Sequence, residues 1–144
     1  PTSNLFLGSG LFPLHTAWDK QVKVGLGSDV GAGTSFNQLQ TLNEAYKVQQ
    51  LQGNKLSAFE ALYHATLGSA KALSLEDKLG NFNLGKEADF VVLDLNATAL
   101  QRLRQSRAKN IEDALFALIT MGDDRNIAAT YVFGECVYHQ SSTK

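Results

Sequence analysis

Residues 22–33 have the sequence VKVGLGSDVGAG, and this stretch decides the fold class. Apolar residues alternate with polar or small ones from Val22 to Leu26, which predicts a strand. A loop of small residues follows from Ser28 to Gly33. Such a loop lets a ligand approach the backbone closely, so a strand that ends in one is a frequent place for a functional side chain. The stretch predicts one strand–helix unit of a larger parallel α/β array.

Two helices are expected after this loop. The first begins at Ser35, which has capping-box spacing to Gln38, and ends at Gly53. The second begins at Ser57, with Glu60 as its capping partner, and its apolar residues recur at helical spacing as far as Leu73.

The remaining segments are assigned from turn residues and apolar runs. Because one strand–helix unit cannot close a barrel, much of the architecture is expected to lie upstream, and the chain, which opens at Pro1 without a methionine, is interpreted as a fragment. We expect two parts, the end of a barrel in residues 1–76 and a β-rich part with one inserted helix in residues 77–144. The predicted elements are a loop at 1–13, a short helix at 14–20, a buried strand at 89–94, an exposed basic connector at 96–110, a helix at 111–120 opened by Asn110, a hairpin of 130–133 and 136–138 turning at Gly134, and a frayed tail at 139–144.

Composition excludes several classes of protein. The 144 residues are 44% apolar and 19% charged, with a net charge of −1, which is an ordinary globular balance. Lys and Arg are spread thinly, so we expect neither a nucleic-acid partner nor binding to a membrane surface. No apolar run is long enough to span a bilayer. The single cysteine, Cys136, excludes an internal disulfide and fits a reducing compartment, so a cytoplasmic protein is expected.

Asp29 is the strongest candidate for chemistry. A carboxylate at the carboxyl end of a parallel strand lies where α/β barrels build their active sites. There it could bind a metal ion or take a proton from a metal-bound water. The alternative is a turn aspartate that caps the following helix.

Other titratable residues give weaker signals. His15, His64 and His139 lack the spacing of a zinc site, and His64 is interpreted as a satisfied residue at the edge of a helix. Residues 123–125, Asp-Asp-Arg, are interpreted as a surface ion-pair turn. Residues 31–33 do not form a phosphate loop, because no Lys-Ser/Thr pair follows them.

Several motifs together resemble a known family. They are PTSNLFLGSG at 1–10, VGLGSDVGAG at 24–33, GAGTS at 31–35, ATLGSA at 65–70, LGNF at 79–82, GKEADF at 85–90 and GDDRNI at 122–127. In these runs the chain resembles the guanine deaminases, a family in the aminohydrolase branch of the zinc-dependent amidohydrolase superfamily. The resemblance covers nearly the whole chain.

The resemblance implies a (β/α)8 TIM barrel with a composite β-sandwich, of which this chain supplies the last barrel strand and helix and the C-terminal sandwich strands. It implies a Zn²⁺ cofactor, guanine as substrate, xanthine and ammonia as products, and a homodimer. Asp29 matches the family's aspartate, which binds the metal, takes the proton of the attacking water and contacts the purine. The family's histidine ligands and its catalytic glutamate are expected before Pro1.

Two alternatives to guanine deamination stay open. The substrate could be another aminated ring of the adenosine, triazine or cytosine type, or the chain could be a non-catalytic interaction module.

We also expect a strand at 22–26 to expose an unpaired apolar edge, so that the chain alone associates with its missing part or with itself. A further hypothesis is that the cluster 123–125 anchors the helix at 111–120.

Overall fold

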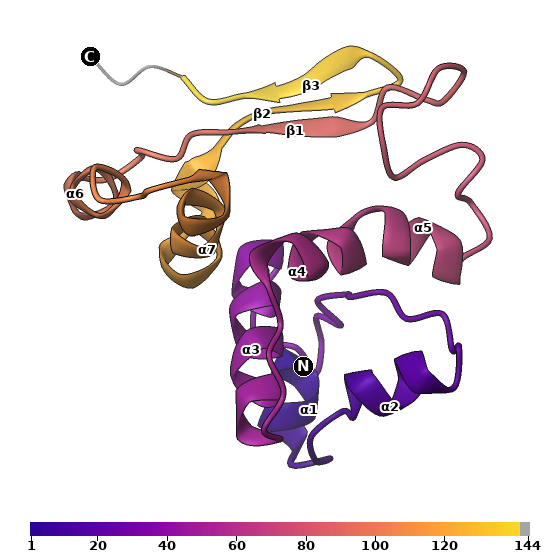
Figure 1. Cartoon of the computed structure of the whole chain (residues 1–144). Helices are drawn as coiled ribbons and strands as arrows, with labels where there is room; N and C mark the ends of the chain where they lie inside the picture. Colours follow the sequence, from indigo (N-terminus) through magenta and orange to yellow (C-terminus); the bar gives the residue numbers. More distant parts are fainter. Residues whose placement is uncertain (142–144) are drawn as a thin grey trace.

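The computed structural model describes residues 1–141 and shows helices together with one small antiparallel sheet (Figure 1). This mixture confirms the expected α/β class. The elements in chain order are α1 (Thr2–Leu7), α2 (Leu14–Asp19), α3 (Gln38–Leu51), α4 (Ala58–Ala65), α5 (Leu67–Ala72), β1 (Phe90–Leu93), α6 (Ala99–Gln105), α7 (Ile111–Met121), a 3₁₀ turn (Asp124–Asn126), β2 (Ile127–Val132) and β3 (Glu135–His139).

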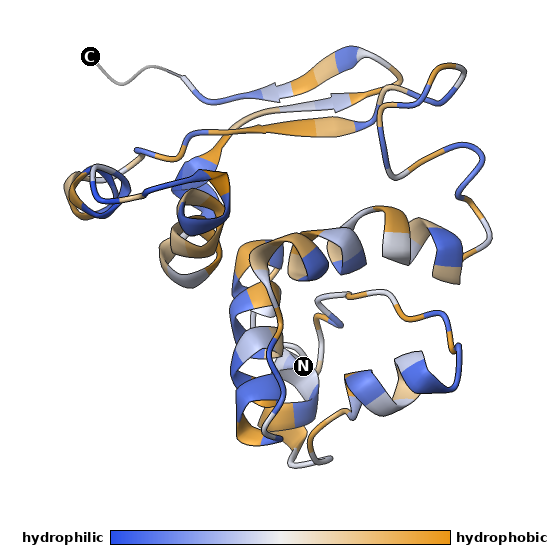
Figure 2. Ribbon diagram, in the orientation of Figure 1, coloured by the Kyte–Doolittle hydropathy of each residue, from blue (hydrophilic) through white to orange (hydrophobic). Residues whose placement is uncertain are grey.

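The core lies where α3, α4 and α7 meet, below the sheet in Figure 1. Leu42 of α3 and Ile119 of α7 are both 1% exposed there. Hydrophobic and hydrophilic residues alternate around α3, whereas β1 is hydrophobic along its length (Figure 2). Burial of one face of each helix therefore holds the three helices together. None of the helices in residues 1–141 has the length and apolar character needed to cross a membrane.

The helix starts show which capping signals were correct. Ser57 and Glu60 form the predicted capping box, in which each side chain accepts a hydrogen bond from the other residue's backbone N–H. The predicted start at Ser35 is wrong, because Asn37 caps α3 by accepting a hydrogen bond from the Leu39 N–H at 2.9 Å. The second predicted helix is interrupted at Thr66, whose backbone leaves the helical region, so α4 and α5 are separate.

Three sequence assignments are corrected by the structure. Residues 1–13 were expected to be a loop but contain α1, and residues 96–110 were expected to be a connector but contain α6, which starts with a capping box of Thr98 and Gln101. No strand forms at 22–26 within residues 1–141, because the backbone groups of Val24 and Leu26 bind to helices and not to another strand. The expected unpaired strand edge at that place is therefore wrong as well.

The sheet has the strand order β1-β2-β3, and all its pairs are antiparallel. The predicted hairpin is confirmed, and its turn at Phe133 and Gly134 has positive φ at both residues, as a type I′ turn requires. The strand predicted at 89–94 forms as β1, but it is not buried, since Val91 is 50% and Val92 is 44% exposed. Of the predicted frayed tail, His139 ends β3, and residues 142–144 lie outside the described part.

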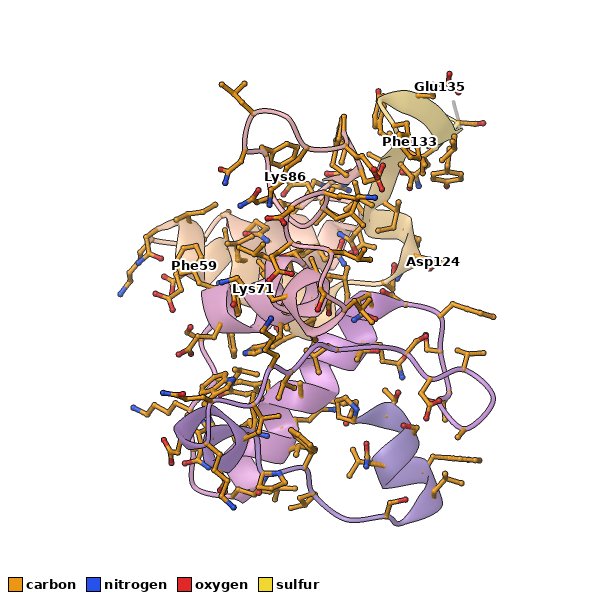
Figure 3. All side chains as sticks on the ribbon, turned by 90° about the vertical axis from the view of Figure 1, so that its right-hand side faces the viewer. Phe59, Lys71, Lys86, Asp124, Phe133 and Glu135 are labelled. Carbon is orange, nitrogen blue, oxygen red and sulfur yellow. The ribbon has the colours of Figure 1, made fainter. Side chains whose placement is uncertain are left out.

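The cluster at 123–125 forms a surface turn, as the first interpretation proposed. Asp123 accepts hydrogen bonds from the guanidinium and the backbone N–H of Arg125, and Asp124 lies at the surface (Figure 3). Arg125 bonds to no other residue in the described chain. The neighbouring Asn126, which is fully buried, makes the long-range bonds instead, to Asp94 and Gln101. Anchoring by the charged residues is therefore not supported.

Candidate active site

Asp29 lies in a tight turn that follows the extended segment 22–28. Its φ is 49°, in the left-handed region that aspartate tolerates better than most residues. Its backbone carbonyl accepts hydrogen bonds from the N–H groups of Ala32 at 3.2 Å and Gly33 at 2.5 Å. A backbone of this kind costs about 1–3 kcal/mol and persists only where the surrounding structure fixes it.

Gly33 makes the turn possible. A Cβ atom at this position would lie 1.8 Å from the carbonyl oxygen of Ser28 and 2.9 Å from that of Asp29. Both distances are below van der Waals contact and the first is far below it, so no side chain fits without moving the Ser28–Asp29 backbone. A hydrogen bond of 3.3 Å from the Thr2 hydroxyl to the same Ser28 carbonyl holds the turn against α1. These contacts therefore fix the backbone from which the Asp29 side chain projects.

A cavity of about 280 Å³ opens beside this turn, between the extended segment, α1 and α3. This volume is close to the lower end of the range for ligand pockets. The side-chain oxygen of Gln49 is buried there and has no hydrogen-bond partner among the described residues, while its nitrogen donates to the Phe12 carbonyl at 3.1 Å. The lining residues are Pro1, Ser3, Asn4, Phe12, Leu14, Val24, Gly25, Leu26, Gly27, Asp29, Ala45, Val48 and Gln49. The wall is thus largely apolar with a few polar groups, Asp29 being the only charged side chain.

The Asp29 carboxylate is exposed and is not engaged by any hydrogen bond or ion pair within residues 1–141. The alternative interpretation, an aspartate that caps the next helix, is wrong because Asn37 caps α3. An unpaired carboxylate oxygen is a suitable zinc donor and an effective proton acceptor. No group of three or more His, Cys, Asp or Glu that could hold a metal ion forms in the described chain.

The three histidines lie elsewhere. His64 is 3% exposed, and its Nδ1 donates to the carbonyl of Val24 at 2.8 Å. It was expected at the edge of a helix but is buried, although its hydrogen bonding is satisfied as predicted. His15 bonds through Nε2 to the Lys55 carbonyl at 3.1 Å, and His139 is exposed at the end of β3.

Sequence reasoning missed the residues that hold the segment leading to Asp29. These are Gln38, His64 and Ser69, which lie on three different helices and hydrogen-bond to Val24 or Leu26. Up to 43 residues separate these partners in the chain. No local spacing can reveal such contacts.

Comparison with known proteins gives consistent matches. The model of the amidohydrolase family matches residues 1–137. Guanine deaminase from Escherichia coli is 62% identical over 98% of this chain and 32% of its own length, and its solved structure superposes with a TM-score of 0.96 over 33% of that chain. Guanine deaminase from Bradyrhizobium japonicum is 39% identical, with a TM-score of 0.91 over 98% of this chain and 37% of that one. The chain spans about a third of the length of these relatives.

Two more distant structures contain ligands. A guanine deaminase from C. acetobutylicum, solved with bound guanine, is 31% identical, with a TM-score of 0.79 over 96% of this chain and 32% of that one. An adenosine deaminase from Xanthomonas campestris, solved with bound zinc, is 27% identical, with a TM-score of 0.80 over 94% and 30%.

Proposed function

Since this chain belongs to the amidohydrolase family, we propose that the protein containing it hydrolyses guanine to xanthine and ammonia. The observation that carries the proposal is the 62% identity to E. coli guanine deaminase, which extends over 98% of the chain. Identity at this level, sustained over 141 aligned residues, argues for a shared substrate. One water is consumed, and the exocyclic amine of guanine leaves as ammonia.

In this proposal Asp29 is a metal ligand, a catalytic residue and a contact for the substrate. The cofactor would be Zn²⁺, with Asp29 as its only ligand from the described residues, and a bound zinc would supply Lewis acidity that lowers the pKa of water. The Asp29 carboxylate would take the proton of the water that attacks C2 of guanine, because it is exposed and carries no competing hydrogen bond. The same carboxylate can accept a hydrogen bond from an N–H group of the purine.

The turn around Asp29 would fix the distance between carboxylate and substrate. The Asp29 carbonyl closes this turn by accepting hydrogen bonds, and Gly33 approaches Ser28 closely. The backbone that carries the carboxylate therefore has little freedom to move. Rigid placement of a proton acceptor lowers the entropy lost on reaching the transition state.

The partner, the completed fold, the oligomeric state and the location are also proposed from the likeness to guanine deaminases. We expect guanine as the small-molecule partner, a (β/α)8 barrel that completes the site, a homodimer and a cytoplasmic location. The division of the chain into parts 1–76 and 77–144 stays a prediction.

A second candidate function is deamination of a different ring. It is favoured by the likeness to the X. campestris adenosine deaminase, which has a TM-score of 0.80. Guanine is the better candidate because that likeness has 27% identity, against 62% for the E. coli guanine deaminase.

The deciding experiment measures guanine-dependent ammonia release by the full natural protein that contains this sequence, beside its Asp29→Asn variant. We expect the variant to lose about 10²–10⁴-fold in kcat, which is the contribution of a positioned acid or base. Asp77→Asn, the same change at an exposed acid outside the cavity, is the matched control and should keep the activity. Turnover of another aminated ring but not guanine would reject the substrate, and an Asp29→Asn variant as fast as the parent would reject the role of Asp29.

A further inference from the structure

Three helices hold the segment that leads to Asp29, through hydrogen bonds to its backbone. His64 of α4 donates from Nδ1 to the Val24 carbonyl at 2.8 Å. The Leu26 N–H donates to both the His64 carbonyl at 3.0 Å and the Ser69 hydroxyl of α5 at 3.1 Å. Gln38, the first residue of α3, donates to the Leu26 carbonyl at 3.0 Å. We propose that His64 and Ser69 are positioning residues, which set the place of the Asp29 carboxylate through the backbone of Val24 and Leu26.

The His64 ring is well placed to act as a fixed donor. It is 3% exposed, stacks on Trp18 with ring centroids 5.1 Å apart, and forms a T-shaped contact with the Tyr63 ring at a centroid distance of 5.2 Å. Because Val24 offers a carbonyl oxygen, Nδ1 must carry the proton. A buried donor held on two sides by aromatic rings has little rotational freedom, so it defines the position of Val24.

Ser69 connects the end of α4 with the segment that leads to Asp29. Its hydroxyl donates to the His64 carbonyl at 2.6 Å and accepts from the Leu26 N–H. Gly25 allows this approach, since a Cβ there would lie 2.7 Å from the Ser69 hydroxyl oxygen and 2.8 Å from the Ser69 Cα. The α4–α5 junction thus lies directly against the segment. Phe59 on α4 and Lys71 on α5 mark these two helices in Figure 3.

The effect reaches Asp29 because the connection is short. Three peptide links separate Leu26 from Asp29, a span of at most about 10 Å when extended. The Gln38 bond closes residues 27–37 into a loop whose two ends are fixed at Leu26 and at the start of α3. Thr2 holds the Ser28 carbonyl from the other side. A shift of Leu26 is therefore passed on to the turn that carries the carboxylate.

The experiment exchanges the donor of His64 in the full natural protein. His64→Leu removes the donor, whereas His64→Asn keeps an N–H donor at the position of Nδ1 with a smaller side chain. Ser69→Ala removes the second contact. The matched control is Ser57→Ala, which removes the cap of α4 without touching Val24 or Leu26. Each variant is examined for kcat and KM with guanine, for zinc affinity by competition with a chelator, and for hydrogen exchange of peptides covering residues 24–33.

The proposal rests on the proposed function for its kinetic result only. We expect His64→Leu and Ser69→Ala to lower kcat about tenfold to a hundredfold with KM changed less than threefold. They should also weaken zinc binding and speed exchange at 24–33, and His64→Asn should recover most of each loss. Ser57→Ala should lower the melting temperature and leave kcat and exchange at 24–33 as in the parent.

Two further outcomes separate the possible failures. A parent protein that does not act on guanine would reject the proposed function, while the exchange measurements would still decide whether His64 and Ser69 hold the segment. A His64→Leu variant with parental kcat and parental exchange would overturn the positioning role. So would a loss of kcat that Ser57→Ala reproduces at equal loss of stability, because that result would indicate general destabilisation.

Discussion

Replacement of Gly33 by alanine tests whether the turn geometry controls the chemistry at Asp29. The new Cβ would start 1.8 Å from the Ser28 carbonyl oxygen, and ordinary contact between such atoms needs about 3.3 Å. The carbonyl must therefore retreat by about 1.5 Å, and the adjacent Asp29 moves with it. A misplacement of about 1 Å at a reacting group costs on the order of 100-fold in rate. We expect Gly33→Ala to lower kcat for guanine by that factor or more.

The assay is steady-state ammonia release by the full natural protein, with the zinc content of each preparation measured alongside. Gly27→Ala is the matched control for the added methyl group, because its Cβ would have no atom within 4 Å and its backbone is not left-handed. It should leave the melting temperature and the hydrogen exchange of residues 28–33 as in the parent, whereas Gly33→Ala should speed that exchange. A Gly33→Ala variant with parental kcat and parental exchange would refute the argument that this turn fixes the carboxylate.

Two further predictions concern stability. Asn126→Ala should lower the free energy of unfolding by about 3 kcal/mol, measured by denaturant titration. The change removes the side-chain donor to the Asp94 carbonyl and both hydrogen bonds between the buried side chains of Asn126 and Gln101. A loss below about 1 kcal/mol would contradict this. The pKa of Glu60 is lowered, first by the hydrogen bond from the Ser57 backbone N–H and then by the one from the Ser57 hydroxyl. The ionised Glu60 carboxylate therefore stabilises the fold above its ordinary pKa of about 4.3. This stabilisation is lost as the pH falls through the lowered pKa of Glu60. At pH 6 the melting temperature of the parent should therefore exceed that of Glu60→Gln. The two melting temperatures should converge as the pH falls through the lowered pKa of Glu60. A difference that stays the same from pH 6 down through that range would contradict the assignment.

Local signals predicted the helices that carry them. Ser57 with Glu60 marked the start of α4, and Asn110 marked the start of α7, because a cap is made by residues within one turn of each other. The same rule failed at Ser35, where Asn37 lies two residues closer to the helix and offers an equally good acceptor. Competing caps at adjacent positions differ too little in free energy for sequence alone to decide between them.

The strand expected at 22–26 shows the limit of periodicity. Alternation of apolar and polar residues describes which side chains can be buried, and Val24 and Leu26 do pack against the core. It does not say which groups form hydrogen bonds with the backbone N–H and C=O groups of the segment. In the described structure those partners are helices, because His64 and Ser69 approach the segment closely where Gly25 has no side chain.

The sequence by itself determined the α/β class, the hairpin, the capped helices and the identity of Asp29 as the residue to examine, since each depends on neighbours within a few positions or on a motif. Only the tertiary structure decided that the Asp29 carboxylate is unpaired beside a cavity, and that residues about 40 positions away on α4 and α5 hold its segment. The physical reason is that a hydrogen bond depends on distance in space, which chain separation does not fix. A sequence pattern reports local geometry, whereas the position of a catalytic group depends on packing between elements that are remote in the chain.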